Sequence, residues 1–136
     1  MGSIRKEILL TARPQQVWDA LRDVGALHTR LVPGFVINTQ LEGETRIVTF
    51  ANGMTIREPI VAVDDEHQRL VWSAEGGQLT HYNGAAQVFA NNDGSAMLVW
   101  TADFLPHAAA PLIEGMMEQG AAAMKKAFSS ASSPPR

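Results

Sequence analysis

The sequence predicts an α+β fold in which a curved, seven-stranded antiparallel sheet wraps around one long C-terminal helix, with two short helices after the first strand. Two observations lead to this prediction. Residues 35–105 hold six strand-like runs joined by short turn-forming clusters, and short connections favour antiparallel neighbours. After Pro106, apolar residues return at helical spacing over roughly five turns. One face of such a sheet must be covered by an apolar surface of another element, and the last helix has the largest apolar surface.

The first part of the chain combines a strand with short helices. Residues 4–11 are typical of a strand that ends in a polar break. Pro14 then stands where a first helical turn tolerates proline. The apolar face of the helix that follows consists of Val17, Trp18, Leu21 and Val24. Gly25 ends this helix, and a short irregular segment over residues 26–32 is expected to form the second one.

The six strand-like runs are rich in β-branched, aromatic and aliphatic residues. They cover residues 35–41, 45–50, 54–63, 69–74, 82–90 and 96–105. Asn52-Gly53, between the second and third of these runs, is a strong hairpin signal. Pro59 inside the third run indicates a bulge or an unpaired edge, because proline cannot donate a ladder hydrogen bond.

The C-terminal helix presents one apolar stripe toward the sheet. The stripe consists of Leu112, Ile113, Met116, Met117, Ala123, Met124, Ala127 and Phe128. A strongly curved sheet that grips one helix often leaves room beside it, so we expect a lined cavity with its mouth near the loops. Gly115 and Gly120 either admit ligand bulk there or allow close packing on the sheet. The length fits one domain over residues 1–128, followed by a flexible Ser- and Pro-rich tail over residues 129–136.

Composition removes several classes of function. The 136 residues carry 11 Lys and Arg against 14 Asp and Glu, so a net charge of -3 argues against nucleic-acid and anionic-membrane partners. The lack of cysteine excludes disulfides, thiol catalysis and Cys-ligated metals. The four histidines form no metal-binding pattern, and neither a metal nor another cofactor is expected. Because the sequence shows neither a signal peptide nor a membrane-spanning stretch, we expect a cytoplasmic protein. We expect it to be a monomer or a homodimer.

Strand alternation selects the candidate site residues, because fixing one inward side chain fixes its neighbours. An inward Tyr82 takes Gly84 and Ala86 with it, and an inward Glu58 takes Ile56 and Ile60. The inward phase of residues 96–105 stays open, because that run is apolar on both sides. The predicted ligand-contacting residues are Ile56, Glu58, Ile60, Trp72, Tyr82, Gly84, Trp100, Leu112, Met116, Met117 and Gly120.

Glu58 and Tyr82 are the candidate catalytic residues. A carboxylate on the apolar side of a strand is costly unless it is paired or protonated, and desolvation raises its pKa toward that of a useful acid or base. Three roles for Glu58 stay open: pairing with an arginine such as Arg46 or with solvent, ligand binding, and catalysis. Tyr82 either donates a hydrogen bond to a ligand or is a core aromatic residue whose hydroxyl has a backbone partner.

Several segments are similar to the helix-grip superfamily, also called SRPBCC or START–Bet v 1-like. These segments are ARPQQVW at 12–18, RIVTFANG at 46–53, IRE at 56–58, VDDE at 63–66, RLVW at 69–72 and WTADF at 100–104. The chain resembles most the small bacterial branch of polyketide cyclase/dehydrase-like proteins. Residues 56–88 also resemble the ligand-binding half of plant hormone receptors. That resemblance implies that Glu58 and Tyr82 hold the polar parts of a ligand.

Three functions remain open at this stage. The first is binding of a small, mostly hydrophobic molecule (a polyketide, a phenolic or a lipid-like metabolite) in the cavity between sheet and helix. The second is a cofactor-independent cyclase, aromatase or dehydratase that acts on such a molecule, with Glu58 or Tyr82 as the acid or base. The third is a protein-interaction or stress-related module in which the cavity is incidental.

Overall fold

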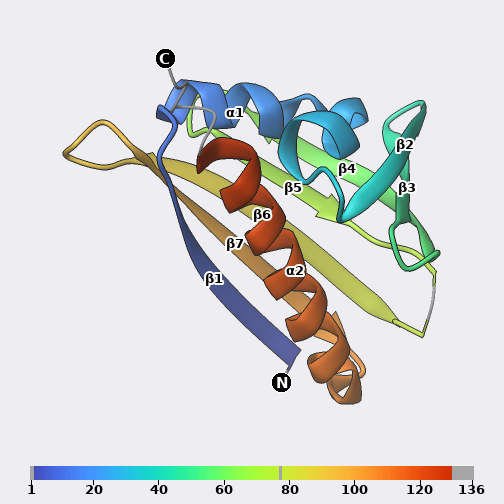
Figure 1. Cartoon of the computed structure of the whole chain (residues 1–136). Helices are drawn as coiled ribbons and strands as arrows, with labels where there is room; N and C mark the ends of the chain where they lie inside the picture. Colours follow the sequence, from blue (N-terminus) through green and yellow to red (C-terminus); the bar gives the residue numbers. More distant parts are fainter. Residues whose placement is uncertain (1, 77, 130–136) are drawn as a thin grey trace.

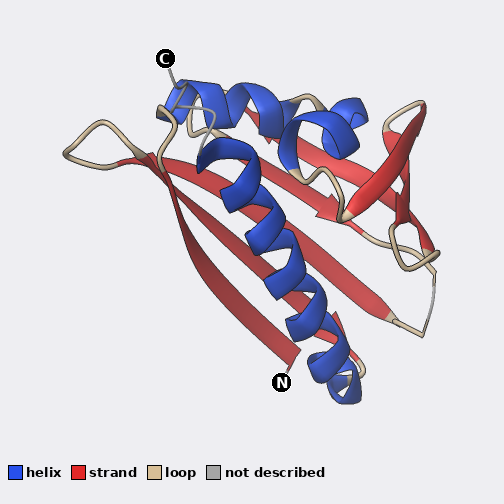
Figure 2. Ribbon diagram, viewed as in Figure 1, coloured by secondary structure: helices blue, strands red, loops and turns tan. Residues whose placement is uncertain are grey.

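The computed structural model describes residues 2–76 and 78–129, and it places every helix on one face of a single curved sheet (Figures 1 and 2). The strands are β1 (Gly2–Leu10), β2 (Val36–Glu42), β3 (Thr45–Phe50), β4 (Thr55–Asp64), β5 (Arg69–Ser73), β6 (His81–Ala90) and β7 (Ala96–Leu105). The helices are α1 (Pro14–Arg22), the 3₁₀ turn η1 (Val24–Ala26), the π-helical turn η2 (Leu27–Leu31), the 3₁₀ turn η3 (His107–Ala109) and α2 (Ala110–Ser129). No described helix is long and apolar enough to cross a bilayer.

The sheet has the spatial order β1-β7-β6-β5-β4-β3-β2 with antiparallel neighbours. Consecutive strands from β2 to β7 are neighbours because short turns join them, and β1 adds to the far edge beside β7. Gly53, with φ of +92°, adopts in the β3–β4 turn a backbone conformation that favours glycine. The pairing of β4 with β5 shifts between Ile60 and Ala62, immediately after Pro59. The predicted fold class is therefore confirmed, and the bulge lies beside the proline that indicated it.

One face of the sheet is apolar and carries the helices. On β7 the inward residues are Leu98, Trp100, Ala102 and Phe104, while Asp103 on the other face is exposed. This settles the phase of residues 96–105, which the sequence left open. Helix α2 lies diagonally across the inner face in Figure 1, and Lys6 on β1 pairs with Glu114 and Glu118 of this helix.

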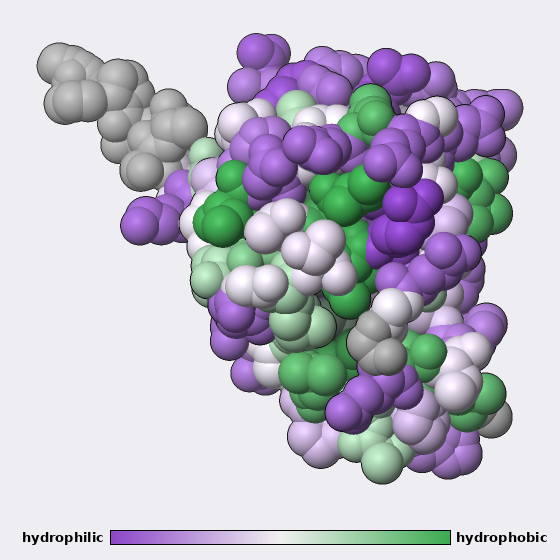
Figure 3. All heavy atoms as spheres, turned by 90° about the vertical axis from the view of Figure 1, so that its right-hand side faces the viewer, coloured by the Kyte–Doolittle hydropathy of each residue, from purple (hydrophilic) through white to green (hydrophobic). Residues whose placement is uncertain are grey.

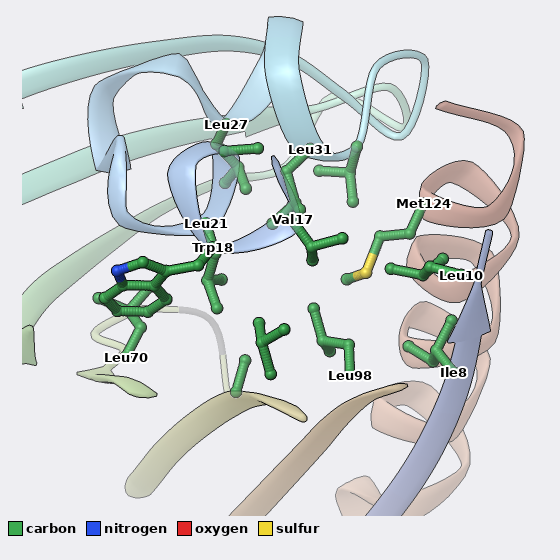
Figure 4. Packing of buried hydrophobic residues seen from close by; sticks show 14 of the residues in the cluster. Ile8, Leu10, Val17, Trp18, Leu21, Leu27, Leu31, Leu70, Leu98 and Met124 are labelled. Carbon is green, nitrogen blue, oxygen red and sulfur yellow. The ribbon is translucent and has the colours of Figure 1, made fainter. Parts of the chain in front are cut away.

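Helix α1 closes one end of the inner face over a densely filled core. Side chains from β1, α1, β7 and the end of α2 interdigitate there, as Figure 4 shows for Ile8, Val17, Leu98 and Met124. The Trp18 indole N–H donates to Asp65 Oδ1 at 2.9 Å, and Arg22 Nε donates to the same oxygen at 2.7 Å. These two bonds attach α1 to the β4–β5 turn.

Two boundaries differ from the predicted ones. The first helix ends at Arg22 rather than near Gly25, so Val24 lies in η1, and the expected second short helix consists of the consecutive turns η1 and η2. At the C-terminus α2 includes Ser129, the first residue of the predicted tail, and residues 130–136 lie outside the described part of the chain.

Candidate functional site

A cavity of about 120 Å³ lies between the inner face of the sheet and the N-terminal half of α2. Its walls come from the end of α1, η2, the start of β2, strands β3 to β7 and helix α2. The lining residues are Leu21, Leu27, Leu31, Val32, Phe35, Val36, Arg46, Phe50, Met54, Ile56, Glu58, Trp72, Ala74, Gly76, Gln78, Leu79, Tyr82, Ala86, Trp100, Leu112, Ile113, Met116, Met117 and Met124. The walls are thus apolar except at a few positions, which is the usual composition of a small-molecule site.

The exposed lining residues mark the mouth. They are Gly76 and Gln78 of the β5–β6 connection and Leu112 in the first turn of α2. Figure 3 views the molecule from the side where the β3–β4 turn and the β5–β6 connection lie, and it shows hydrophobic atoms exposed in a hollow bordered by polar residues. An apolar molecule therefore meets apolar surface before it reaches the interior.

Eight of the predicted ligand-contacting residues line this cavity. They are Ile56, Glu58, Trp72, Tyr82, Trp100, Leu112, Met116 and Met117. Ile60, Gly84 and Gly120 do not line it. Ile60 lies beyond the cavity at the β4 bulge, and the two glycines are covered by tryptophan side chains.

Each of the two glycines makes room for an indole ring. A Cβ atom added at Gly84 on β6 would lie 2.6 Å from the Trp72 ring, and one added at Gly120 on α2 would lie 2.9 Å from the Trp100 ring. For Gly120 the structure therefore shows close packing against the sheet. Nothing lies within 4 Å of the corresponding point at Gly115.

Arg46 and Glu58 form a buried ion pair in the cavity wall. They are direct cross-strand neighbours on β3 and β4, and Arg46 Nε donates to Glu58 Oε1 at 2.8 Å. Only 3% of Arg46 and 8% of Glu58 is exposed. The guanidinium carbon also lies 5.4 Å from the centroid of the Trp72 ring, which is a cation–π distance. The desolvation of Glu58 raises the pKa of its carboxyl, and the charge of Arg46 opposes this effect without cancelling it.

Tyr82 and Trp100 lie next to this ion pair. Burial, and then the nearby charge of Glu58, raise the pKa of the Tyr82 hydroxyl, so it stays protonated and can donate. The Trp100 indole N–H is buried and makes no hydrogen bond within the described part of the chain, although it is close enough to Tyr82 to lower the pKa of that hydroxyl slightly. Arg46, Glu58, Tyr82 and Trp100 thus form the polar end of an otherwise apolar cavity.

Sequence reasoning missed several wall residues. Phe35 and Phe50 meet edge to face with ring centroids 5.2 Å apart, and both line the cavity. Alternation along residues 45–50 could have placed Phe50 on the inner face beside Arg46 and Val48. Strand alternation does not place Gln78 or Leu79, because they lie in an irregular connection. Among residues 2–76 and 78–129, no group of His, Asp and Glu side chains is arranged to hold a metal ion.

Comparisons with solved structures place this architecture among known proteins. The XoxI protein from Bacillus cereus superposes with a TM-score of 0.85 at 20% identity, covering 98% of this chain and 100% of that one. An uncharacterised protein from Bacillus thuringiensis gives 0.83 at 20% identity, covering 93% and 98%. Norcoclaurine synthase from Thalictrum flavum, solved with dopamine and hydroxybenzaldehyde, gives 0.71 at 21% identity, covering 91% and 84%. These likenesses confirm the helix-grip fold.

Sequence comparison gives the family. A search of curated proteins found no significant match. A family model described as polyketide cyclase / dehydrase and lipid transport matches residues 1–129, which is nearly the whole chain. The superfamily resemblance of the sequence is thereby confirmed, and this chain belongs to the polyketide cyclase/dehydrase and lipid transport family.

Proposed function

We propose that this protein binds a small, mostly hydrophobic molecule in the cavity between the sheet and α2, with the polar end of the cavity fixing one polar group of that molecule. The observation that carries the proposal is the combination of an apolar, open-mouthed cavity with a compact polar cluster at its inner end. A family described by lipid transport and polyketide chemistry agrees with this class of ligand.

The size of the cavity restricts the ligand. An apolar protein cavity of about 150 Å³ accepts benzene, so the 120 Å³ found here suit about one aromatic ring in this conformation. Ligand sites of drug-sized molecules are larger, at roughly 300–1,000 Å³. Methionine side chains of α2, which adapt their shape readily, form part of the wall and would accommodate somewhat bulkier molecules.

Thermal unfolding in the presence of single-ring aromatic compounds tests the proposal. A ligand at a hundredfold excess over its Kd stabilises the folded state by about 2.7 kcal/mol, so ethylbenzene or acetophenone is expected to raise Tm in a saturable manner. The absence of any saturable shift with these compounds would contradict the proposal.

A matched pair of variants on β6 localises the effect. Ala86 is buried and lines the cavity, whereas its neighbour Ala85 lies on the other face of the sheet and is partly exposed. Ala86→Leu extends into the cavity and is expected to abolish the shift, while Ala85→Leu adds the same atoms outside and is expected to preserve it. Equal shifts in both variants would place the bound molecule elsewhere.

A second candidate function is proton-transfer catalysis on the bound molecule. The observation that favours it is a buried carboxyl with a raised pKa, in a cavity wall and within electrostatic reach of a tyrosine hydroxyl. A cyclase or dehydratase step on a ketone begins with removal of an α-proton. In that step the proton moves to Glu58, and the C–H electron pair forms the C=C bond of an enolate. The C=O π pair moves at the same time to the carbonyl oxygen beside Tyr82.

Isotope exchange measures this step without knowledge of the natural substrate. In D₂O, the wild type is expected to exchange the methyl protons of acetophenone for deuterium, as followed by proton NMR, while Glu58→Gln binds acetophenone and does not exchange them. Equal exchange rates in the two proteins would exclude Glu58 as the base.

A further inference from the structure

We infer that the polar end of the cavity selects a neutral hydrogen-bond acceptor, so that the preferred ligands are compact aromatic ketones and aldehydes. This inference rests on the proposed binding function and adds the chemical class of the ligand.

The first step of the argument is the Tyr82 proton. A phenolic hydroxyl is a hydrogen-bond donor as long as it is protonated, and burial raises the pKa of Tyr82. No described residue accepts this proton, and the hydroxyl oxygen is not among the fully buried unpartnered atoms. Because Tyr82 lines the cavity, its proton is free for an acceptor there.

The second step is the balance of donors and acceptors around that proton. Arg46 uses Nε for Glu58, and its two terminal nitrogens have no hydrogen-bond partner among the described residues while keeping some accessible surface. Because Arg46 lines the cavity and is almost fully buried, that surface faces the cavity. The polar end of the cavity therefore has more unpaired hydrogen-bond donors than acceptors. The donors belong to Tyr82 and Arg46, and the one unpaired acceptor is the second carboxyl oxygen of Glu58. A ligand with an acceptor complements this excess of donors.

The third step concerns the charge and shape of the ligand. The positive charge of Arg46 is offset by Glu58 at 2.8 Å, so a carboxylate would enter an apolar cavity without a counter-charge of its own. A neutral carbonyl avoids that cost. Much of the wall consists of flat aromatic rings, which suit a flat aromatic ligand in the limited volume. These rings belong to Phe35, Phe50, Trp72, Tyr82 and Trp100.

Acetophenone and ethylbenzene test the inference, because they have similar shapes and only the first has an acceptor. A neutral hydrogen bond changes affinity by about tenfold at most. We expect Tyr82→Phe to weaken acetophenone about tenfold and to change ethylbenzene less than about twofold. Each compound is compared with itself, so differences in water solubility cancel.

The outcomes separate this inference from the proposed function. If both compounds bind and Tyr82→Phe weakens them equally, the acceptor rule is overturned and the binding function stands. Tighter binding of benzoate than of acetophenone would overturn the preference for a neutral ligand. If neither acetophenone nor ethylbenzene binds the wild type, the proposed function itself fails. Circular dichroism of Tyr82→Phe establishes that it is folded, and the comparison of benzoate with acetophenone in the wild type tests the inference without any substitution.

Discussion

The space between the sheet and the helices is filled at one end and hollow at the other. Under α1, aliphatic side chains such as Leu10, Val17 and Leu98 interdigitate and leave almost no exposed surface (Figure 4). Under the N-terminal half of α2, a cavity of about 120 Å³ remains. Tyr82 and Trp100 line the hollow end and pack against both of the apolar clusters that the described residues form.

The two ends differ in the polar groups that they bury and in how those groups are satisfied. Trp18, at the filled end, donates its indole N–H to Asp65, whereas Trp100 has no such partner at the hollow end. The hollow end also holds the Arg46–Glu58 pair and rigid aromatic rings, which do not collapse into the space. At about 24 cal/mol per Å³, a void of this size costs about 3 kcal/mol. The cavity therefore lowers the stability of the unliganded folded state, and a ligand that fills the cavity can restore that stability.

Removing the counter-charge of Glu58 is expected to give the largest effect. Arg46→Met leaves a buried carboxylate unpaired, and loss of one partner of such a pair costs about 3–5 kcal/mol of unfolding free energy at neutral pH. The loss should shrink at acidic pH, because a protonated Glu58 needs no partner. Urea unfolding at pH 7 and pH 5 measures both quantities.

The double variant Arg46→Met, Glu58→Leu controls for packing at the hollow end. It removes both charges and is expected to recover most of the stability lost in the single variant, since apolar replacements of buried pairs are often neutral or stabilising. A double variant as unstable as Arg46→Met would mean that the Arg46 side chain stabilises by its packing on Trp72, and the charge argument would fall.

Truncation of one core residue at each end sharpens the comparison. Leu98→Ala at the filled end creates a new cavity and is expected to cost about 3–5 kcal/mol. Met117→Ala, an equally buried residue that already borders the hollow, is expected to cost about 2 kcal/mol, because fewer packing contacts are lost. Chemical unfolding of both variants gives the difference, and equal losses would show that the cavity wall is packed as tightly as the core.

The fold and much of the wall could be predicted from sequence, and the hollow itself could not. Alternation along each strand fixes which side chains face inward, so Glu58, Tyr82 and Trp72 were predicted on the cavity side, where the structure places them. Whether inward residues fill the space depends on the separation of the elements and on side-chain rotamers. Strand alternation therefore gives no basis for deciding that Gly84 and Gly120 lie under indole rings, or that Gln78 and Leu79 line the cavity.

Two glycines of α2 provide a smaller, matched test of the packing around Trp100. Gly115→Ala meets nothing within 4 Å and is expected to stabilise the protein by about 0.5–1 kcal/mol through helix propensity. Gly120→Ala gains the same propensity but places Cβ 2.9 Å from the Trp100 ring, and overpacking costs about 1–3 kcal/mol. A net loss of about 1 kcal/mol is therefore expected from thermal or chemical unfolding. A stabilising Gly120→Ala would mean that Trp100 moves freely toward the cavity.

The pH dependence of stability gives the smallest expected effect and separates the two charged environments. The folded-state pKa of Glu58 is raised above its ordinary value of 4.5, so the folded protein holds this proton more tightly than the unfolded chain. The resulting stability is present below pH 4.5 and is lost as the pH rises through the folded-state pKa.

At the exposed His67–Asp64 pair, by contrast, the hydrogen bond raises the pKa of His67 and lowers that of Asp64. Glu58→Gln should remove the decline in unfolding free energy that begins at pH 4.5. His67→Gln should leave that decline unchanged and remove only a separate one that begins at pH 6.5. If Glu58→Gln keeps the wild-type profile, the burial of Glu58 does not dominate its titration, and its role as a base loses its physical support.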